Sequence, residues 1–302
     1  MDLSIERSLL QKSIRRGAVE ITEKVFYYLY QHNDLKWLRN RLPIIAYEEC
    51  WTAADQLYDD QNPRRLLEQY KTLASTVKNK NAAGLATLAH YYKGGDKSIL
   101  RNANPKQRNA IESISNAIKD PTAFWEWVTK QQPNYTRHNS RIEAARKSEK
   151  KANFETDRAM MYAAAYLAVK GEIPETATSQ LSQPLNSPNF PYWIAFDKHT
   201  ETGRLFITKA AENLQMEYFL TSQLFFFLEG AKCNKVTASP YWDLAVEWKM
   251  RKTGYANDQL KIIWNKLRPE LMRIIREEAE ELKERIEADP KPNNEGDQLG
   301  LF

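Results

Sequence analysis

Apolar residues recur every three or four positions through residues 260–286, and this spacing constrains the fold more than any other feature. The repeat comprises Leu260, Trp264, Leu267, Leu271, Ile274, Ile275, Leu282 and Ile286. A three- and four-residue spacing places side chains on one face of an α-helix. The sequence therefore predicts a long amphipathic helix here. Pro269 either kinks it or begins its second half, because proline lacks the backbone N–H that a helix interior needs.

The rest of the chain favours helices as well. Only 10 of its 302 residues are glycine, and no repeated alternation of apolar and polar residues indicates strands. Helix-start signals stand at 62–63, 104–105 and 120–121, where Asn or Asp precedes Pro. The lysine- and asparagine-rich segment 78–81 reads as a polar break between helices. We predict a mostly α fold, although the short run Phe225-Phe226-Phe227 is compatible with a strand or a helix.

A long segment rich in Pro, Ser, Thr and Gln, residues 171–189, suggests an internal boundary. We therefore expect one helical domain over residues 1–170. A second, mostly helical or α+β region is expected over residues 171–288. Residues 289–302 begin with a Pro- and Asn-rich stretch, which is typical of a flexible tail.

Cysteine content and hydropathy limit the class of protein. Cys50 and Cys233 lie far apart, with no zinc-binding CxxC pair, which favours a reducing compartment. No segment reaches the roughly 18 apolar residues of a membrane helix. We expect a soluble, cytoplasmic protein without a membrane partner. No cofactor is expected, since the nearest approach to a phosphate-binding loop, residues 94–98, lacks the required spacing.

The last five residues, Gln298-Leu299-Gly300-Leu301-Phe302, form an apolar anchor with one amide side chain. They resemble the peptide by which replication and repair proteins bind the bacterial sliding clamp, which reads Gln-Leu, then Ser or Asp, then Leu-Phe. Gly300 departs from that pattern. The resemblance implies that Leu301 and Phe302 fill an apolar pocket of the clamp, Gln298 a polar one, and Leu299 the space between them. It also implies a bacterium, or a phage or plasmid that uses the clamp of its host.

Residues near the N-terminus carry a second resemblance. Lys12 to Arg15 followed by Leu29, then Arg41-Leu42, Ala46 and Glu48, resemble the C-terminal helical region of the RarA/MgsA family, which are clamp-loader-related AAA+ ATPases. Asn40, Pro43 and Tyr47 depart from the family pattern. The resemblance covers about 45 residues and implies a collar-like oligomerisation domain, so clamp-loader or AAA+ subunits and a homo-oligomer are expected partners. The ATPase half of that family is missing, so we expect no ATP hydrolysis.

A basic window over residues 130–151 is a candidate DNA-binding surface. Two glutamates, Glu143 and Glu149, oppose its cations, of which the predicted DNA ligands are Arg137, Arg141, Arg146, Lys147, Lys150 and Lys151. Such cations neutralise phosphates, while nearby rings such as Trp125 stack on bases. A solvated helix face is the alternative interpretation. Arg41 is similarly ambiguous, because it either joins a basic surface or pairs with Glu48.

Residues 197–204 form a polar island between aromatic segments, in which Asp197, His199 and Glu201 are compatible with a metal-dependent nuclease. A polar turn is the commoner explanation, and we predict neither a metal site nor catalytic residues. The favoured interpretation is a non-enzymatic accessory protein of DNA replication or repair that binds the sliding clamp. The alternatives are a clamp-tethered nuclease or other DNA-modifying enzyme, and an ATPase-lacking subunit of a clamp-loader assembly.

Overall fold

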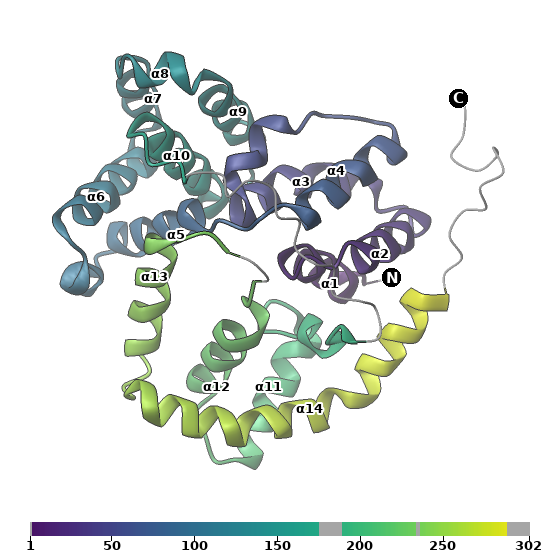
Figure 1. Cartoon of the computed structure of the whole chain (residues 1–302). Helices are drawn as coiled ribbons and strands as arrows, with labels where there is room; N and C mark the ends of the chain where they lie inside the picture. The colour runs from purple at the N-terminus through teal and green to yellow at the C-terminus, as the bar shows by residue number, and fades with distance from the viewer. Residues whose placement is uncertain (1, 175–188, 234–235, 289–302) are drawn as a thin grey trace.

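The computed structural model describes residues 2–174, 189–233 and 236–288, and within these ranges it contains helices but no strand (Figure 1). The predicted mostly α fold is confirmed. The regular elements are α1 (Ser4–Arg15), α2 (Val19–Gln31), α3 (Leu35–Glu49), η1 (Trp51–Gln56), α4 (Pro63–Ser75), α5 (Asn81–Lys93), η2 (Lys97–Asn102), α6 (Pro105–Lys119), α7 (Pro121–Thr129), α8 (Asn134–Arg137), α9 (Asn139–Glu149), α10 (Glu155–Val169), η4 (Tyr192–Ala195), α11 (Glu201–Asn213), α12 (Tyr218–Phe225), η5 (Phe226–Gly230), α13 (Pro240–Arg251) and α14 (Asn257–Ala288).

Three N-terminal helices form one side of the molecule. Gly17 ends α1 with a φ of 71°, a left-handed conformation that glycine adopts without strain. The chain then turns back, and Ile21, Val25 and Leu29 bury one face of α2. The next helix, α3, continues through Pro43. α1 packs against α2 and α4 on one hand and against η4 on the other.

The centre of the fold is the pair α5 and α10. Every residue of α10 from Ala159 to Val169 is buried, and its small side chains let neighbouring helices approach closely. α10 packs against α5, α6 and α9, while the other side of α5 packs against α13. One continuous core extends from Leu3 to Ile286 and so includes residues on both sides of the segment 171–189.

The last helix encloses the molecule on one side. Figure 1 shows α14 as a long curved helix that passes α11 and α12 and ends near α1. The predicted apolar face is confirmed, since Leu260, Leu267, Leu271, Leu282 and Ile286 are buried. The helix continues through Pro269. Along the described parts of the chain, no helix has the length and apolar character needed to cross a bilayer.

The aromatic run at 225–227 is helical. α12 ends at Phe225, and a single π-helical turn, η5, follows. The strand alternative for this run, and with it a mixed α+β second region, is wrong for the described residues. Phe225 is fully buried and stacks on Trp193, while Phe226 and Phe227 are half-buried.

Gly84 on α5 allows a close approach to the backbone of α13, and alanine there is expected to destabilise the fold. An added Cβ would lie 2.3 Å from the backbone nitrogen of Trp242 on α13. Overpacking costs about 1 to 3 kcal/mol, and a clash with backbone atoms lies at the upper end of that range or above it, against a gain in helix propensity of about 1 kcal/mol. We expect Gly84→Ala to lower the free energy of unfolding in urea by about 2 kcal/mol. Gly94→Ala, which meets no atom closer than 3.3 Å, should change it far less, and equal effects would contradict the close approach.

Candidate functional site

A cavity of about 320 Å³ opens where α1, α3 and the loop before α11 meet. Most of its lining residues are polar or charged, and Trp37 and Phe226 add aromatic rings. Its lining residues are Ser4, Arg7, Ser8, Gln11, Lys12, Arg15, Trp37, Arg41, Glu48, Asp197, His199, Thr200 and Phe226. The α1 residues recur at three- and four-residue intervals, so one face of this helix forms a wall of the cavity. We call it the Lys12 cavity.

A buried ion pair joins α1 to the loop before α11. Lys12 Nζ lies 2.8 Å from Asp197 Oδ2, and the two side chains are 5% and 1% exposed. Burial lowers the pKa of Lys12 below its ordinary value, although Asp197 opposes this. Burial also acts to raise the pKa of Asp197, but Lys12 and His199 outweigh it and hold that pKa well below its usual range. Asp197 is therefore a carboxylate, and the pair connects segments 185 positions apart.

Local hydrogen bonds fix the Asp197 loop. Thr200 caps α11 by accepting a hydrogen bond from Gly203 N at 3.1 Å, and its own hydroxyl donates to the Asp197 carbonyl. Asp197 Oδ1 accepts from His199 N at 2.9 Å and lies 3.1 Å from His199 Nδ1. A capped helix start therefore positions the carboxylate that Lys12 contacts.

A second buried network connects α1 with α3 and with Lys80, the residue that precedes α5. Arg15 Nε donates to Glu49 at 2.7 Å, and Arg15 Nη2 donates to Glu48 at 2.8 Å. Glu49 is fully buried and lies 3.1 Å from Lys80 Nζ, a lysine that is 1% exposed. Burial acts to raise the pKa of Glu49, but Arg15 and Lys80 together lower it below its ordinary value. The guanidinium and ammonium thus compensate a charge that would otherwise be costly to bury.

Two features noticed separately in the sequence meet at the Lys12 cavity. Four polar residues of the RarA/MgsA-like pattern line it, namely Lys12, Arg15, Arg41 and Glu48, as do Asp197 and His199 of the polar island. Ser13, also part of that pattern, is instead buried beside Thr22. The apolar residues of that pattern, including Leu29, are buried in the core. Burial in the core thus explains why these positions are apolar. Arg41 does approach Glu48, but only to 4.0 Å.

The third residue of the polar island does not join the other two. Glu201 is exposed at the start of α11 and does not line the cavity. Among the described residues, no group of three or more His, Cys, Asp or Glu side chains is placed to hold a metal ion. Sequence reasoning missed Trp37 and Lys80, because a tryptophan in a helix and a lysine in a polar break carry no signal of a site.

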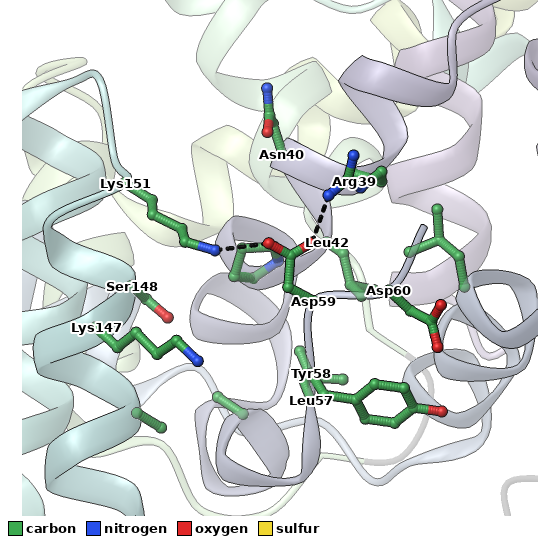
Figure 2. A pocket seen from close by; sticks show the side chains of 14 residues that line it. Arg39, Asn40, Leu42, Leu57, Tyr58, Asp59, Asp60, Lys147, Ser148 and Lys151 are labelled. Atoms are coloured by element: carbon green, nitrogen blue, oxygen red, sulfur yellow. Dashed lines mark hydrogen bonds and ion pairs between the residues drawn. The ribbon is translucent and has the colours of Figure 1, made fainter. Parts of the chain in front are cut away.

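The basic window lies beside a smaller cavity of about 120 Å³ between α3, the segment 57–60 and α9 (Figure 2). Figure 2 shows Asp59 between Arg39 and Lys151, each of which lies 2.9 Å from one of its oxygens. Hydrogen bonds from Lys151 and Arg39 lower the pKa of Asp59 to about 2. Part of the positive charge of the window is therefore neutralised within the protein.

The six predicted DNA ligands divide into two groups. Arg141 approaches Asp55, Lys151 pairs with Asp59, and Arg146 lies over the ring of Trp125. No ion pair with the described part of the chain holds the others, which are exposed: Arg137, Lys147 and Lys150. The Trp125 ring is 7% exposed and packs against Tyr162, so it is not available to stack on bases as the sequence suggested.

The predicted clamp-binding residues Gln298, Leu299, Leu301 and Phe302 lie outside the described residues. Comparison with models of known protein families, with curated proteins and with solved structures gives no match for this chain.

Proposed function

We propose that this protein is a non-enzymatic accessory factor of DNA replication or repair, which binds a bacterial-type sliding clamp through residues 298–302. The observation that carries the proposal is the peptide Gln298-Leu299-Gly300-Leu301-Phe302, which matches the clamp-binding pattern at four of five positions. Short peptides of this kind bind through a few apolar anchors. The proposal therefore needs little from the rest of the fold except a surface from which the peptide can reach a partner.

The end of α14 provides such a surface. Ala288, the last described residue, is exposed, and 14 residues follow it to Phe302. A chain of that length spans up to about 45 to 50 Å when extended. A peptide at its end can therefore reach a partner that does not touch the helical body. The sequence resemblance of residues near the N-terminus to the RarA/MgsA family adds support to the proposal.

Capture of the clamp tests the proposal directly. The full chain and a chain truncated after Ala288 should be immobilised side by side and exposed to purified bacterial sliding clamp. We expect the full chain to retain the clamp and the truncated chain to retain none. The truncated chain keeps every described helix, so its circular dichroism should remain helical. Equal retention by both chains, or retention by neither, would reject the proposal.

A second prediction concerns DNA contact through the basic window. Ion pairs and a cation–π contact within the protein engage three of the six predicted ligands, which leaves the other three available for phosphates. Replacing Arg137, Lys147 and Lys150 by glutamine should weaken DNA binding and flatten its salt dependence, because fewer counterions are released. With about 0.9 of slope for each neutralised phosphate, the three substitutions should reduce the slope of log K against log salt by about 2 to 3. Fluorescence anisotropy with a labelled duplex, measured over a range of salt concentrations, gives this slope.

The control for this prediction removes the same charge elsewhere. Three exposed cations on α14, replaced together by glutamine, change the net charge equally at a distance from the window: Lys261, Lys266 and Arg276. Their removal should leave the slope nearly unchanged. If both triple variants change the slope equally, the window is a solvated helix face.

A further inference from the structure

Arg41 differs from the other cations that line the Lys12 cavity. Arg7, Lys12 and Arg15 each lie 2.7 or 2.8 Å from a carboxylate oxygen. Arg41 is 3.8 Å from Asp157 and 4.0 Å from Glu48, and its hydrogen bond to Gln11 Oε1 is 3.4 Å long. A guanidinium carries five N–H donors. Most donors of Arg41 thus have no close acceptor in the described structure, although its side chain is only 27% exposed.

The nearest carboxylates do not compensate Arg41 well. Asp157 remains under-stabilised, since burial raises its pKa above the ordinary value despite the opposing effect of Arg41. Glu48 accepts hydrogen bonds from Arg15 and from Gln11 Nε2. Its oxygens are therefore already engaged by donors other than Arg41. A further anion in the cavity would supply the close acceptor that Arg41 lacks.

The rest of the cavity suits a small anionic ligand. Its volume of about 320 Å³ falls at the lower end of the range of about 300 to 1,000 Å³ typical of ligand sites. Lys12 Nζ is close to two acceptors, Ser8 Oγ and Asp197 Oδ2, so one of its three N–H groups remains available. The rings of Trp37 and Phe226 add apolar wall. Donors from α1 and α3 thus border one space.

We propose that the Lys12 cavity binds a phosphate group, presented by a nucleotide or by the end of a nucleic-acid strand, with Arg41 as its main ligand-binding residue. A phosphate group offers three terminal oxygens and so accepts from donors on several sides, whereas a carboxylate offers two oxygens in one plane. The planar guanidinium of Arg41 matches two of those oxygens at once. The lining residues of this site include none of the six predicted DNA ligands and none of residues 298–302. A test of phosphate binding is therefore independent of a test of clamp binding.

Titration calorimetry of the full chain tests the site, first with inorganic phosphate and then with succinate at the same ionic strength. We expect heat of binding with phosphate and at least about tenfold weaker binding of succinate, because the carboxylates lack the third oxygen. Adenosine monophosphate against adenosine, and a 5′-phosphorylated oligonucleotide against its 5′-hydroxyl form, then distinguish the two sources. A preference for the phosphorylated member of either pair supports the site. Absence of phosphate binding, or succinate that binds as tightly, overturns it.

Arg41→Gln is the decisive variant, since it removes the charge and the paired donors. It should weaken phosphate binding at least about tenfold. Arg41→Lys keeps the charge but lacks the paired N–H donors of the guanidinium, so it should recover part of the loss. Arg65→Gln is the matched control, because Arg65 is exposed on α4 and lies outside the cavity. This variant should bind phosphate as tightly as the natural chain does. Phosphate affinity unchanged in Arg41→Gln would reject the site.

A modification experiment on the unchanged chain covers the case in which Arg41→Gln does not fold. Phenylglyoxal modifies accessible arginines, and mass spectrometry locates the modified residues. Phosphate should slow modification of Arg41 and leave Arg65 unaffected. Equal rates of Arg41 modification with and without phosphate would reject the proposal.

Discussion

Replacing Leu301 and Phe302 together by alanine is expected to weaken binding to the sliding clamp by at least about 100-fold. Full burial of a leucine or phenylalanine side chain contributes about 1.5 to 3 kcal/mol, and a factor of ten in affinity corresponds to about 1.4 kcal/mol. Two such anchors therefore account for a large part of the binding free energy of a short peptide, which we expect near −8 kcal/mol, or roughly micromolar affinity. Fluorescence anisotropy with a labelled peptide of residues 289–302 and purified clamp measures the loss.

Two further substitutions distinguish this specific binding mode from nonspecific hydrophobic binding of an apolar tail. Gln298→Ala should weaken binding less than loss of the apolar pair, because one hydrogen-bonding side chain contributes about 1 kcal/mol. Gly300→Ser restores the commoner residue of the pattern and should bind as well or better, since glycine loses more backbone entropy on docking. Competition by an established clamp ligand should release the peptide. A peptide that binds equally well with and without Leu301 and Phe302 would rule out this mode of binding.

Local signals in the sequence predict much of the helical fold. α4, α6 and α7 begin at Pro63, Pro105 and Pro121, where Asn or Asp precedes proline and caps the new helix. The period of α14 likewise marks its buried face. These features depend on residues within one or two turns, so a sequence displays them directly.

Local signals fail where tertiary contacts override composition. The sequence predicts a polar break between helices at 78–81, and polar residues are most often exposed, yet Lys78 and Lys80 are buried. Lys78 Nζ donates to the carbonyls of Leu73 at 2.6 Å and Ala74 at 2.9 Å, at the end of α4, and Lys80 pairs with Glu49. Each lysine is buried because it finds acceptors, which the composition of the segment does not reveal.

Sequence reasoning identified some residues of the candidate site but not their arrangement. The residue types around Lys12 and Asp197 stood out separately, but nothing in the sequence pairs two positions 185 residues apart. The underused donors of Arg41 depend on distances of 3.4 to 4.0 Å to three other side chains, one of them on α10. Such a feature arises only once α1, α3 and α10 are packed together.

The buried pair between Lys12 and Asp197 leads to the largest stability effect that we expect in the helical body. Lys12→Met keeps most of the aliphatic volume but leaves a carboxylate that is 1% exposed without its closest cation. Removing one partner of a buried ion pair costs about 3 to 5 kcal/mol, because the remaining charge is uncompensated. Urea denaturation at neutral pH should show a loss of that order. Adding Asp197→Asn should restore much of it, since asparagine keeps the shape and removes the charge.

The pH dependence distinguishes lost charge compensation from lost packing. In the natural chain the pKa of Asp197 lies below its unfolded value of about 3.9, so its contribution to stability is present above that pH and is lost as the pH falls towards the folded pKa. In Lys12→Met, burial still acts to raise the pKa of Asp197 and only His199 opposes it, so we expect a higher folded pKa than in the natural chain. The variant should therefore lose less stability than the natural chain when Asp197 takes up a proton. The difference in unfolding free energy between the two chains should therefore shrink as the pH is lowered from 7 towards about 4. A difference that stays constant over this range would mean that Lys12 stabilises the fold through packing alone.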